Sequence, residues 1–180
     1  MANRKTLVVN LYAGPGAGKT TGAWIIAGEL KKLNIVTEYV SEYAKELIWD
    51  NESHLLGGSF KNQFNVLKEQ NRRINRLIGK VDVVVTDSPI LQQGMYVQER
   101  IDEFNNIAFS LYNMYSNFDI FIERGHYFEQ AGRIHSREES IEIDTKIKNF
   151  FKQNRIEYKV CRHDTLSHVI NDIKISLDII

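Results

Sequence analysis

The chain has 180 residues, and its 23 Lys and Arg residues balance 23 Asp and Glu residues, so the formal net charge is zero. Hydrophobic residues make up 43% and charged residues 26%, as in an ordinary folded protein, and we expect residues 1–180 to form one domain. One cysteine, Cys161, excludes a disulfide framework and a cysteine-rich zinc module, and the balanced charge disfavours broad coating of nucleic acid.

Apolar runs are short throughout the sequence. None approaches the roughly 20 residues that a helix needs to span a bilayer. The apolar run that follows the first six residues is also too short for the core of a signal peptide. We therefore expect a cytoplasmic protein that does not associate with a membrane.

Strand-like and helix-like segments alternate along the chain. Short apolar runs rich in β-branched residues predict strands over residues 7–12, 35–40, 81–86, 119–123 and 157–161. The segments between them have helical spacing and predict helices over residues 19–33, 42–49, 60–78, 101–116 and 136–153, then a last helix capped by Thr165. Ser136 and Glu139 have the spacing of a capping box. This alternation predicts a parallel sheet covered by helices on both faces.

The sharpest motif lies between the first predicted strand and the first predicted helix. It matches the phosphate-loop pattern [Ala/Gly]-x4-Gly-Lys-[Ser/Thr], and the expected nucleotide-binding residues are Gly14, Pro15, Gly16, Ala17, Gly18, Lys19, Thr20 and Thr21. Glycines let the backbone N–H groups turn into one concave nest, which holds phosphate oxygens together with the helix N-terminus. We expect Lys19 to reach the β- and γ-phosphates of ATP, and the Thr20 hydroxyl to bind Mg²⁺.

Small phage-encoded P-loop kinase-like ATPases resemble this chain in five segments, in order: LVVNLYAGPGAGKTT, EYVSEYAKEL, VDVVVTDSPI, FIERGHYFEQAGR and EIDTKIKNFF. These proteins are similar in turn to nucleoside and nucleotide kinases, including the ribosylnicotinamide kinase domain. The resemblance covers nearly the whole chain. It implies a three-layer α/β P-loop fold with a five-stranded parallel sheet and a lid after the fourth strand. If the protein is phage-encoded, its expected location is the host cytoplasm.

Two carboxylates follow the ends of predicted strands. Asp87 ends the third strand, where a carboxylate can hold Mg²⁺, accept a proton from a hydroxyl, or simply cap the next helix. Glu42 follows the second strand. The resembling kinases have a carboxylate here that contacts the phosphate-accepting hydroxyl, whereas an acidic residue in a first helical turn also suits the helix dipole. Either carboxylate is a candidate general base, and Glu38 is the rival of Glu42.

Further polar residues are candidates for the acceptor site. Gln63 and Gln70 lie on an otherwise apolar face of the helix at residues 60–78, and Arg73 lies nearby. The resemblance has glutamine and arginine at similar spacing, which favours substrate contact over a solvated surface. Ser88, in the turn after Asp87, completes the expected substrate-binding set.

Two arginines, Arg124 and Arg133, flank a polar segment with a glycine at each end. We expect this segment, about residues 124–136, to be a lid whose arginines neutralise charge on the transferring phosphoryl group. The alternative is a plain surface loop with solvated arginines.

The expected activity is transfer of the γ-phosphate of Mg-ATP to a hydroxyl or phosphate of a nucleoside- or nucleotide-like acceptor. One alternative is a kinase acting on a hydroxymethylated base, of the 5-hydroxymethyluracil type, in phage DNA. Another is an NTP-hydrolysing switch with a protein partner and no phosphorylated product. The apolar surplus of the helix at residues 101–116 also makes a homodimer a candidate assembly.

Overall fold

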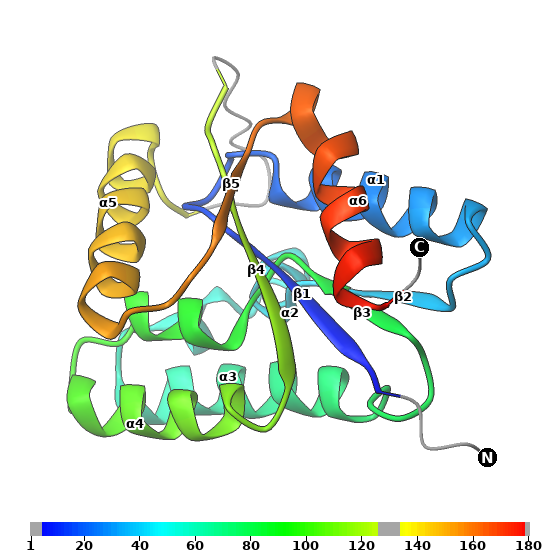
Figure 1. The fold of residues 1–180 in the computed structure, drawn as a ribbon. Helices are drawn as coiled ribbons and strands as arrows, with labels where there is room; N and C mark the ends of the chain where they lie inside the picture. The colour runs from blue at the N-terminus through cyan, green and yellow to red at the C-terminus, as the bar shows by residue number, and fades with distance from the viewer. Residues whose placement is uncertain (1–4, 126–133, 179–180) are drawn as a thin grey trace.

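The computed structural model describes residues 5–125 and 134–178. Within this part of the chain, one parallel sheet has the strand order β2-β3-β1-β4-β5 (Figure 1). The strands are β1 (Leu7–Tyr12), β2 (Thr37–Val40), β3 (Val83–Thr86), β4 (Ser116–Ile122) and β5 (Lys159–Cys161). Because every pairing is parallel, the carboxyl ends of all these strands meet at one edge of the sheet. The predicted five-stranded parallel sheet is confirmed.

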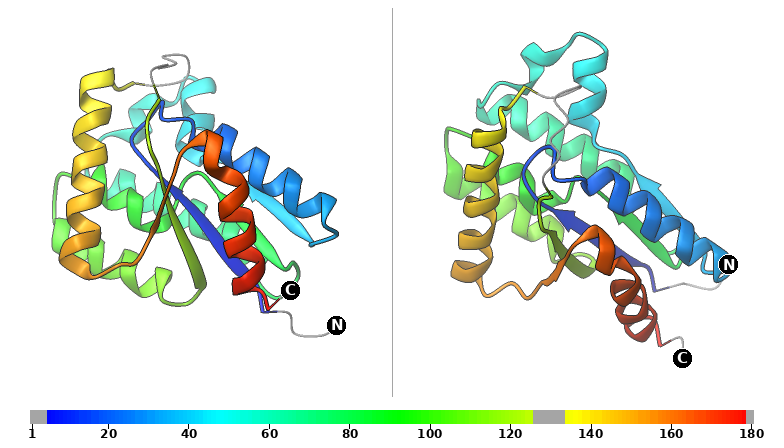
Figure 2. Two further views of the ribbon diagram at one scale, coloured as in Figure 1. Left: turned by 45° about the horizontal axis from the view of Figure 1, so that its top comes forward. Right: turned by 90° about the horizontal axis from the view of Figure 1, so that it is seen from above.

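Helices cover both faces of the sheet (Figures 1 and 2). One face carries α1 (Lys19–Lys32) and α6 (Leu166–Ser176), and the other carries α3 (Phe60–Asn75), α4 (Ile101–Tyr112) and α5 (Arg137–Asn154). The short helix α2 (Tyr43–Trp49) and the 3₁₀ turns η1 (Ser53–Leu56), η2 (Ile90–Met95) and η3 (His163–Thr165) lie in the connections. The molecule therefore has the expected three layers.

The sequence of the central strand β1 is mostly apolar and does not alternate with polar residues. All six of its residues are buried. Val9 and Leu11 pack in the core under α1 and α6, whereas Val8 and Tyr12 pack in the core under α3, α4 and α5. A strand buried on both faces needs an apolar residue at nearly every position.

The largest difference between a predicted and an observed helix end is at the end of α4. The periodicity predicts a helix to residue 116, but α4 ends at Tyr112, and Ser116 already pairs with Leu7 at the start of β4. The apolar surplus of this region makes contacts within the chain. The Phe109 ring stacks on Phe150 with centroids 5.3 Å apart, and the Tyr112 hydroxyl donates to Asp119.

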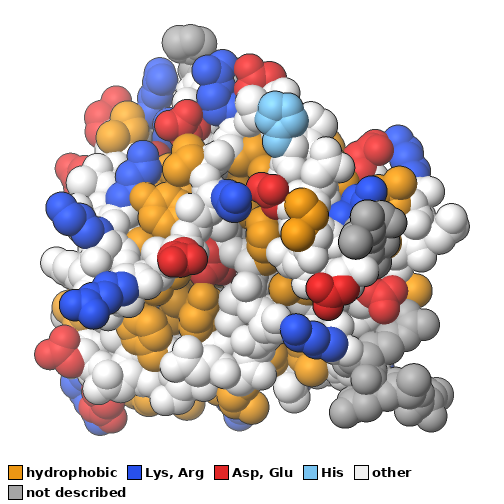
Figure 3. All heavy atoms as spheres, in the orientation of Figure 1, with side chains coloured by type: hydrophobic (Ala, Val, Ile, Leu, Met, Phe, Trp, Pro, Cys, Tyr) orange, Lys and Arg blue, Asp and Glu red, His pale blue; other side chains and the backbone are white. Residues whose placement is uncertain are grey.

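The predicted capping box forms at the start of α5. The Glu139 N–H donates to Ser136 Oγ at 3.2 Å, and the Ser136 N–H donates to Glu139 Oε2 at 2.6 Å. Thr165 precedes α6 as predicted, but its side chain makes no capping bond to that helix. No helix of the described ranges combines the length and apolar character needed to cross a bilayer. On the face shown in Figure 3, acidic and basic side chains are interspersed.

Candidate functional site

The phosphate loop connects β1 to α1 at the carboxyl edge of the sheet. Gly16 and Gly18 have φ angles of 75° and 89°, in the left-handed region that glycine adopts without a steric cost. Gly18 is the N-cap of α1, so Lys19 and Thr20 begin the helix directly beside the loop. This is the backbone form that presents N–H groups to a phosphate.

Lys19 is buried and lies on the loop itself. Its Nζ donates to the Ala13 carbonyl at 2.7 Å and to the Gly14 carbonyl at 3.3 Å. Burial lowers the pKa of Lys19, and the nearby charges of Glu42 and Asp87 partly oppose this effect. The ammonium group therefore lies among carboxylates at the mouth of the loop.

Asp87 and Thr20 form a direct pair under the loop. The Thr20 hydroxyl donates to Asp87 Oδ2 at 2.5 Å, and Asp87 is only 2% exposed. The second carboxylate oxygen, Oδ1, is buried and accepts no hydrogen bond from the residues that the structure describes. A buried carboxylate oxygen without a donor, beside a hydroxyl, fits a hard divalent cation such as Mg²⁺. Asp87 does not cap the next element, because Pro89 is the N-cap of η2.

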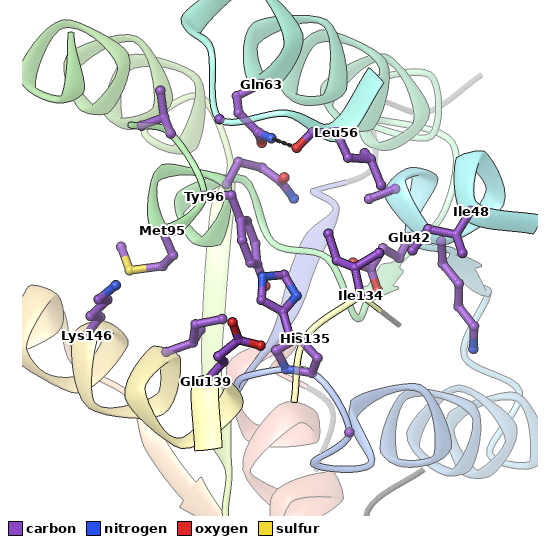
Figure 4. Close-up of a pocket in the computed structure, with 18 of the residues that line it drawn as sticks. Glu42, Ile48, Leu56, Gln63, Met95, Tyr96, Ile134, His135, Glu139 and Lys146 are labelled. Carbon is purple, nitrogen blue, oxygen red and sulfur yellow. Dashed lines mark hydrogen bonds between the residues drawn. The ribbon is translucent and has the colours of Figure 1, made fainter. Parts of the chain in front are cut away.

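A cavity of about 540 Å³ lies on one side of the phosphate loop (Figure 4). Residues from the loop, α2, α3, η2 and α5 line it. Its polar and charged lining includes Lys19, Thr20, Glu42, Lys45, Gln63, Gln93, Tyr96, Gln98, His135, Glu139, Glu142 and Lys146. Ile48, Leu56, Met95 and Ile134 contribute apolar walls. The volume and the mixed lining are those of a small-molecule site.

Glu42 reaches this cavity from the N-cap position of α2. Its side chain makes no capping hydrogen bond to α2, which disfavours the alternative of a simple cap. It lines the cavity together with Lys19 and Thr20, and its charge raises the pKa of Lys19. Burial, followed by the charge of Glu42, also raises the pKa of the Tyr96 phenol. Of the two rival carboxylates, Glu42 therefore faces the cavity, whereas Glu38 is exposed and paired with Lys31.

Gln63 is a buried amide in the wall of the cavity. Its Nε2 donates to the carbonyls of Leu56 at 2.9 Å and Gly57 at 3.2 Å. Because carbonyls only accept, these bonds fix which end of the amide is the donor. No described residue donates to Gln63 Oε1, which leaves that oxygen as an acceptor for a ligand.

Ser88 does not line the cavity. It is buried, and its hydroxyl accepts a hydrogen bond from Gln93 Nε2 at 2.8 Å. Gln93 does line the cavity, so Ser88 orients a lining residue and does not itself reach the space expected for a substrate.

The structure does not place Gln70 and Arg73, the other expected substrate contacts, in the lining of this cavity. Gln70 is fully buried; its Oε1 accepts from the Tyr43 N–H at 3.1 Å, and its Nε2 donates to the Ser41 carbonyl at 3.2 Å. Arg73 donates from Nη1 and Nη2 to Glu46, each at 2.6 Å, and its guanidinium lies over the Tyr43 ring. Both residues hold the segment between β2 and α2 in place and lie outside the cavity lining.

The Arg124 side chain packs against the phosphate loop, although the neighbouring residues Glu123 and Gly125 are exposed. Its Nη1 donates to the Pro15 carbonyl at 2.8 Å, and its Nε donates to Asp144 Oδ2 at 3.0 Å. Its side chain is 9% exposed, so the alternative of a solvated arginine is wrong for this residue. Arg133 lies outside the described residues.

A second cavity, of about 700 Å³, is lined in part by Arg124. Arg124, Asp144, Lys148, Arg162 and His163 are among its lining residues. His163 is packed on the loop: a Cβ at Gly18 would lie 2.2 Å from His163 Nε2. Sequence reasoning missed both His163 and Asp144. Neither has a local signal, because each reaches the loop from more than 120 positions away along the chain.

Comparison with known proteins identifies the family and the fold. A family model described as an AAA domain matches residues 8–167, whereas no curated protein sequence matches. A structure of NadR protein in complex with NAD and AMP-PNP has a TM-score of 0.72 and 13% identity, over 97% of this chain and 50% of that chain. This chain thus spans half the length of that NadR chain. Thymidylate kinase from Ehrlichia chaffeensis has a TM-score of 0.62 and 15% identity, over 96% of this chain and 98% of that chain.

Deoxyadenosine kinase from M. mycoides has a TM-score of 0.51 and 19% identity, over 95% of this chain and 98% of that chain. Identities this low show a shared fold, which is the α/β P-loop fold of nucleotide kinases. The family match covers most of the chain, from the first strand to the start of the last helix. The chain therefore belongs to the AAA domain family of P-loop proteins.

Proposed function

We propose that this protein is an ATP-dependent phosphotransferase that moves the γ-phosphate of ATP to a small nucleoside- or nucleotide-like acceptor. One observation carries the proposal: Lys19 and Thr20 of the phosphate loop line one cavity together with Glu42, and Arg124 and His163, which both contact the loop, line a second cavity. A donor and an acceptor that exchange a phosphoryl group need such a pair of spaces meeting at the phosphates. The kinases among the structural neighbours are consistent with this arrangement.

The phosphate loop and Arg124 are the proposed donor site. Backbone N–H groups of the loop and the N-terminus of α1 bind the phosphates, and Lys19 steadies the charge of the transferring group. Arg124 already touches the loop through Pro15, so its guanidinium is close to where that charge develops. Thr20 and Asp87 would hold Mg²⁺, which supplies further charge neutralisation on the phosphates when it is bound.

Glu42 is the proposed base for the acceptor. The acceptor hydroxyl attacks the γ-phosphorus, its proton passes to the Glu42 carboxylate, and the bond to the bridging oxygen of ATP breaks to release ADP. Asp87 is the weaker candidate for this step, because it is paired with Thr20 and does not line the cavity. The division of roles between the two carboxylates thus follows from what each one faces.

The lining of the first cavity favours a small acceptor with hydrogen-bond donors. Gln63 Oε1 and the Glu42 carboxylate are acceptor groups, and Tyr96 supplies an aromatic surface beside them (Figure 4). A ribose hydroxyl and a base N–H are donors that such groups can bind. A nucleoside fits a cavity of about 540 Å³.

Transfer of labelled phosphate from γ-labelled ATP tests the proposal. The acceptor panel contains nucleosides, nucleoside monophosphates, nicotinamide riboside, and DNA with or without 5-hydroxymethyluracil. Lys19→Ala should abolish labelling of the acceptor. Glu42→Gln should lower kcat by about a hundredfold, the contribution of a general base. The matched control is Glu38→Gln, since Glu38 is exposed on β2 and paired with Lys31, and it should leave kcat unchanged.

Each outcome has a distinct meaning. A labelled small molecule establishes the kinase and identifies its acceptor class. Label only in DNA containing the modified base would replace the small-molecule acceptor by a DNA base. ATP hydrolysis at one rate with every acceptor would refute phosphotransfer, and the protein would then be an NTP-driven switch.

A further inference from the structure

Asp144 connects α5 to the phosphate loop through two separate contacts. Its Oδ1 accepts a hydrogen bond from the Gly14 backbone N–H at 2.5 Å, and its Oδ2 accepts one from Arg124 Nε at 3.0 Å. Arg124 in turn donates from Nη1 to the Pro15 carbonyl at 2.8 Å. The carboxylate, the guanidinium and the loop backbone therefore form a closed ring of contacts at the first turn of the loop.

Close packing restricts the movement of the residues in this ring. A Cβ at Gly14 would lie 2.1 Å from the Ser140 carbonyl oxygen, so the backbone of α5 approaches the loop as nearly as a glycine allows. The Asp144 side chain is 15% exposed and the Arg124 side chain 9%. A charged pair this far from water gains strength from the low local dielectric and holds a narrow range of geometries.

The charge of Asp144 also acts on Lys19, at the end of the phosphate loop. Asp144 raises the pKa of Lys19 and Arg124 lowers it, although burial, which lowers that pKa, has the larger effect. The pair thus adds opposite charges close to Lys19, and loss of one partner would leave the other uncompensated. Asp144 does not line the cavity that contains Glu42, so it is not placed to touch the acceptor.

We propose that Asp144 is a positioning residue that fixes the phosphate loop and aims Arg124 at it, so that the donor site is formed before the nucleotide binds. This inference rests on the proposed function, because it assigns a role in binding the donor. Asp144 acts through Gly14 and Arg124 and does not itself contact the phosphates. Preorganisation of this kind lowers the cost of binding, since loop and guanidinium lose little freedom on complex formation.

Asp144→Asn separates the two contacts. The asparagine Oδ1 still accepts from Gly14, but the charge that holds Arg124 is gone. Calorimetric titration with Mg-AMP-PNP should show about tenfold weaker binding, the size of one charge-assisted hydrogen bond. Glu138→Gln on the same helix is the matched control, because Glu138 is exposed and lines neither cavity. Thermal unfolding of each variant confirms that the protein is folded at the temperature of the titration.

A double-mutant cycle distinguishes positioning from a general loss of stability. In an Arg124→Gln background the Asp144→Asn change should have no further effect on the dissociation constant, because the group that Asp144 aims is absent. The proposal would be overturned if Asp144→Asn weakened nucleotide binding equally with and without the Arg124→Gln change. It would also be overturned if the Asp144→Asn single variant bound Mg-AMP-PNP as tightly as the unmodified protein. Tighter binding by Asp144→Asn would also overturn it, since Asp144 would then restrain Arg124 from the phosphates.

Hydrogen exchange gives a readout that needs no nucleotide. In the ligand-free protein, Asp144→Ala should speed exchange of the Gly14 amide at least tenfold, and Asp144→Asn should speed it less, because Asn keeps an acceptor. Unchanged exchange at Gly14 in Asp144→Ala would refute the positioning role directly. If the unmodified protein fails to bind Mg-AMP-PNP while exchange responds as expected, the proposed function fails and the structural link between Asp144 and the loop stands.

Discussion

Replacing Asp119 by asparagine should remove a pH dependence from the stability of this fold. Asp119 lies in β4 and is 6% exposed. Its carboxylate accepts from Asn10 Nδ2 at 2.8 Å and from the Tyr112 hydroxyl at 2.6 Å. Burial nevertheless raises the pKa of Asp119 from 3.8 to about 6, because the two hydrogen bonds offset only part of the loss of water.

The sign and size of the effect follow from linkage. Between the unfolded value of 3.8 and the folded value of about 6, the folded state binds the proton more tightly than the unfolded state does. The free energy of unfolding therefore falls as the pH rises through this interval, and it levels off above about pH 6. At 1.36 kcal/mol for each pKa unit, the total loss is about 3 kcal/mol.

Urea unfolding at a series of pH values from about 4.5 to about 7.5 measures about 2 kcal/mol of this loss, because the rest occurs at lower pH. The difference in unfolding free energy between Asp119→Asn and the unmodified protein isolates Asp119, because the other groups are common to both. Glu69, for example, has its pKa lowered to about 2 by hydrogen bonds from Arg72 and Arg73, so it stays charged across this range. The difference should grow in favour of Asp119→Asn as the pH rises. A difference that stays constant, or that grows in favour of aspartate, would refute the reasoning.

Three further changes have defined outcomes. Gly28→Ala should raise the free energy of unfolding by about 0.5–1 kcal/mol, because Gly28 is inside α1 and nothing lies within 4 Å of a Cβ there. Gly18→Ala should lower it by about 1–3 kcal/mol and weaken Mg-AMP-PNP binding, because φ is +89° and the methyl group meets His163. Arg73→Lys should cost about 1 kcal/mol in urea unfolding at low salt, since lysine cannot make the two-pronged contact with Glu46, and the KM of the acceptor should not change.

The parts of the fold that depend on neighbours in sequence were predictable. Strand β1 was predicted with its observed limits, and the capping box of α5 needed only Ser136 and Glu139. The loop glycines were predicted from the local motif, and two of them, Gly16 and Gly18, have the left-handed conformation that glycine adopts without a steric cost. Segments at the ends of elements were less predictable, as the early end of α4 shows, because strand pairing decides them.

The polar residues of α3 show why a sequence pattern cannot separate a ligand site from an internal network. Gln63 and Gln70 have the same residue type on the same helical face, and both are buried. Gln63 faces a cavity. Gln70 instead uses both its amide oxygen and its amide nitrogen in hydrogen bonds to the backbone of Tyr43 and Ser41. The difference depends on where the segment after β2 lies, and the spacing along α3 contains no information on that.

The two candidate carboxylates are separated by the same kind of long-range information. In sequence, Asp87 and Glu42 each follow a strand; Asp87 suits a metal ligand, a base or a cap, and Glu42 suits a base or a cap. In the fold, Asp87 is the buried partner of Thr20 and keeps one oxygen without a donor, whereas Glu42 lines the cavity beside Lys19. A base must reach the acceptor hydroxyl, and a metal ligand must lie by the loop hydroxyl. Between these two carboxylates, the positions favour the proposed assignment, in which Glu42 takes the proton and Asp87 orients the cation.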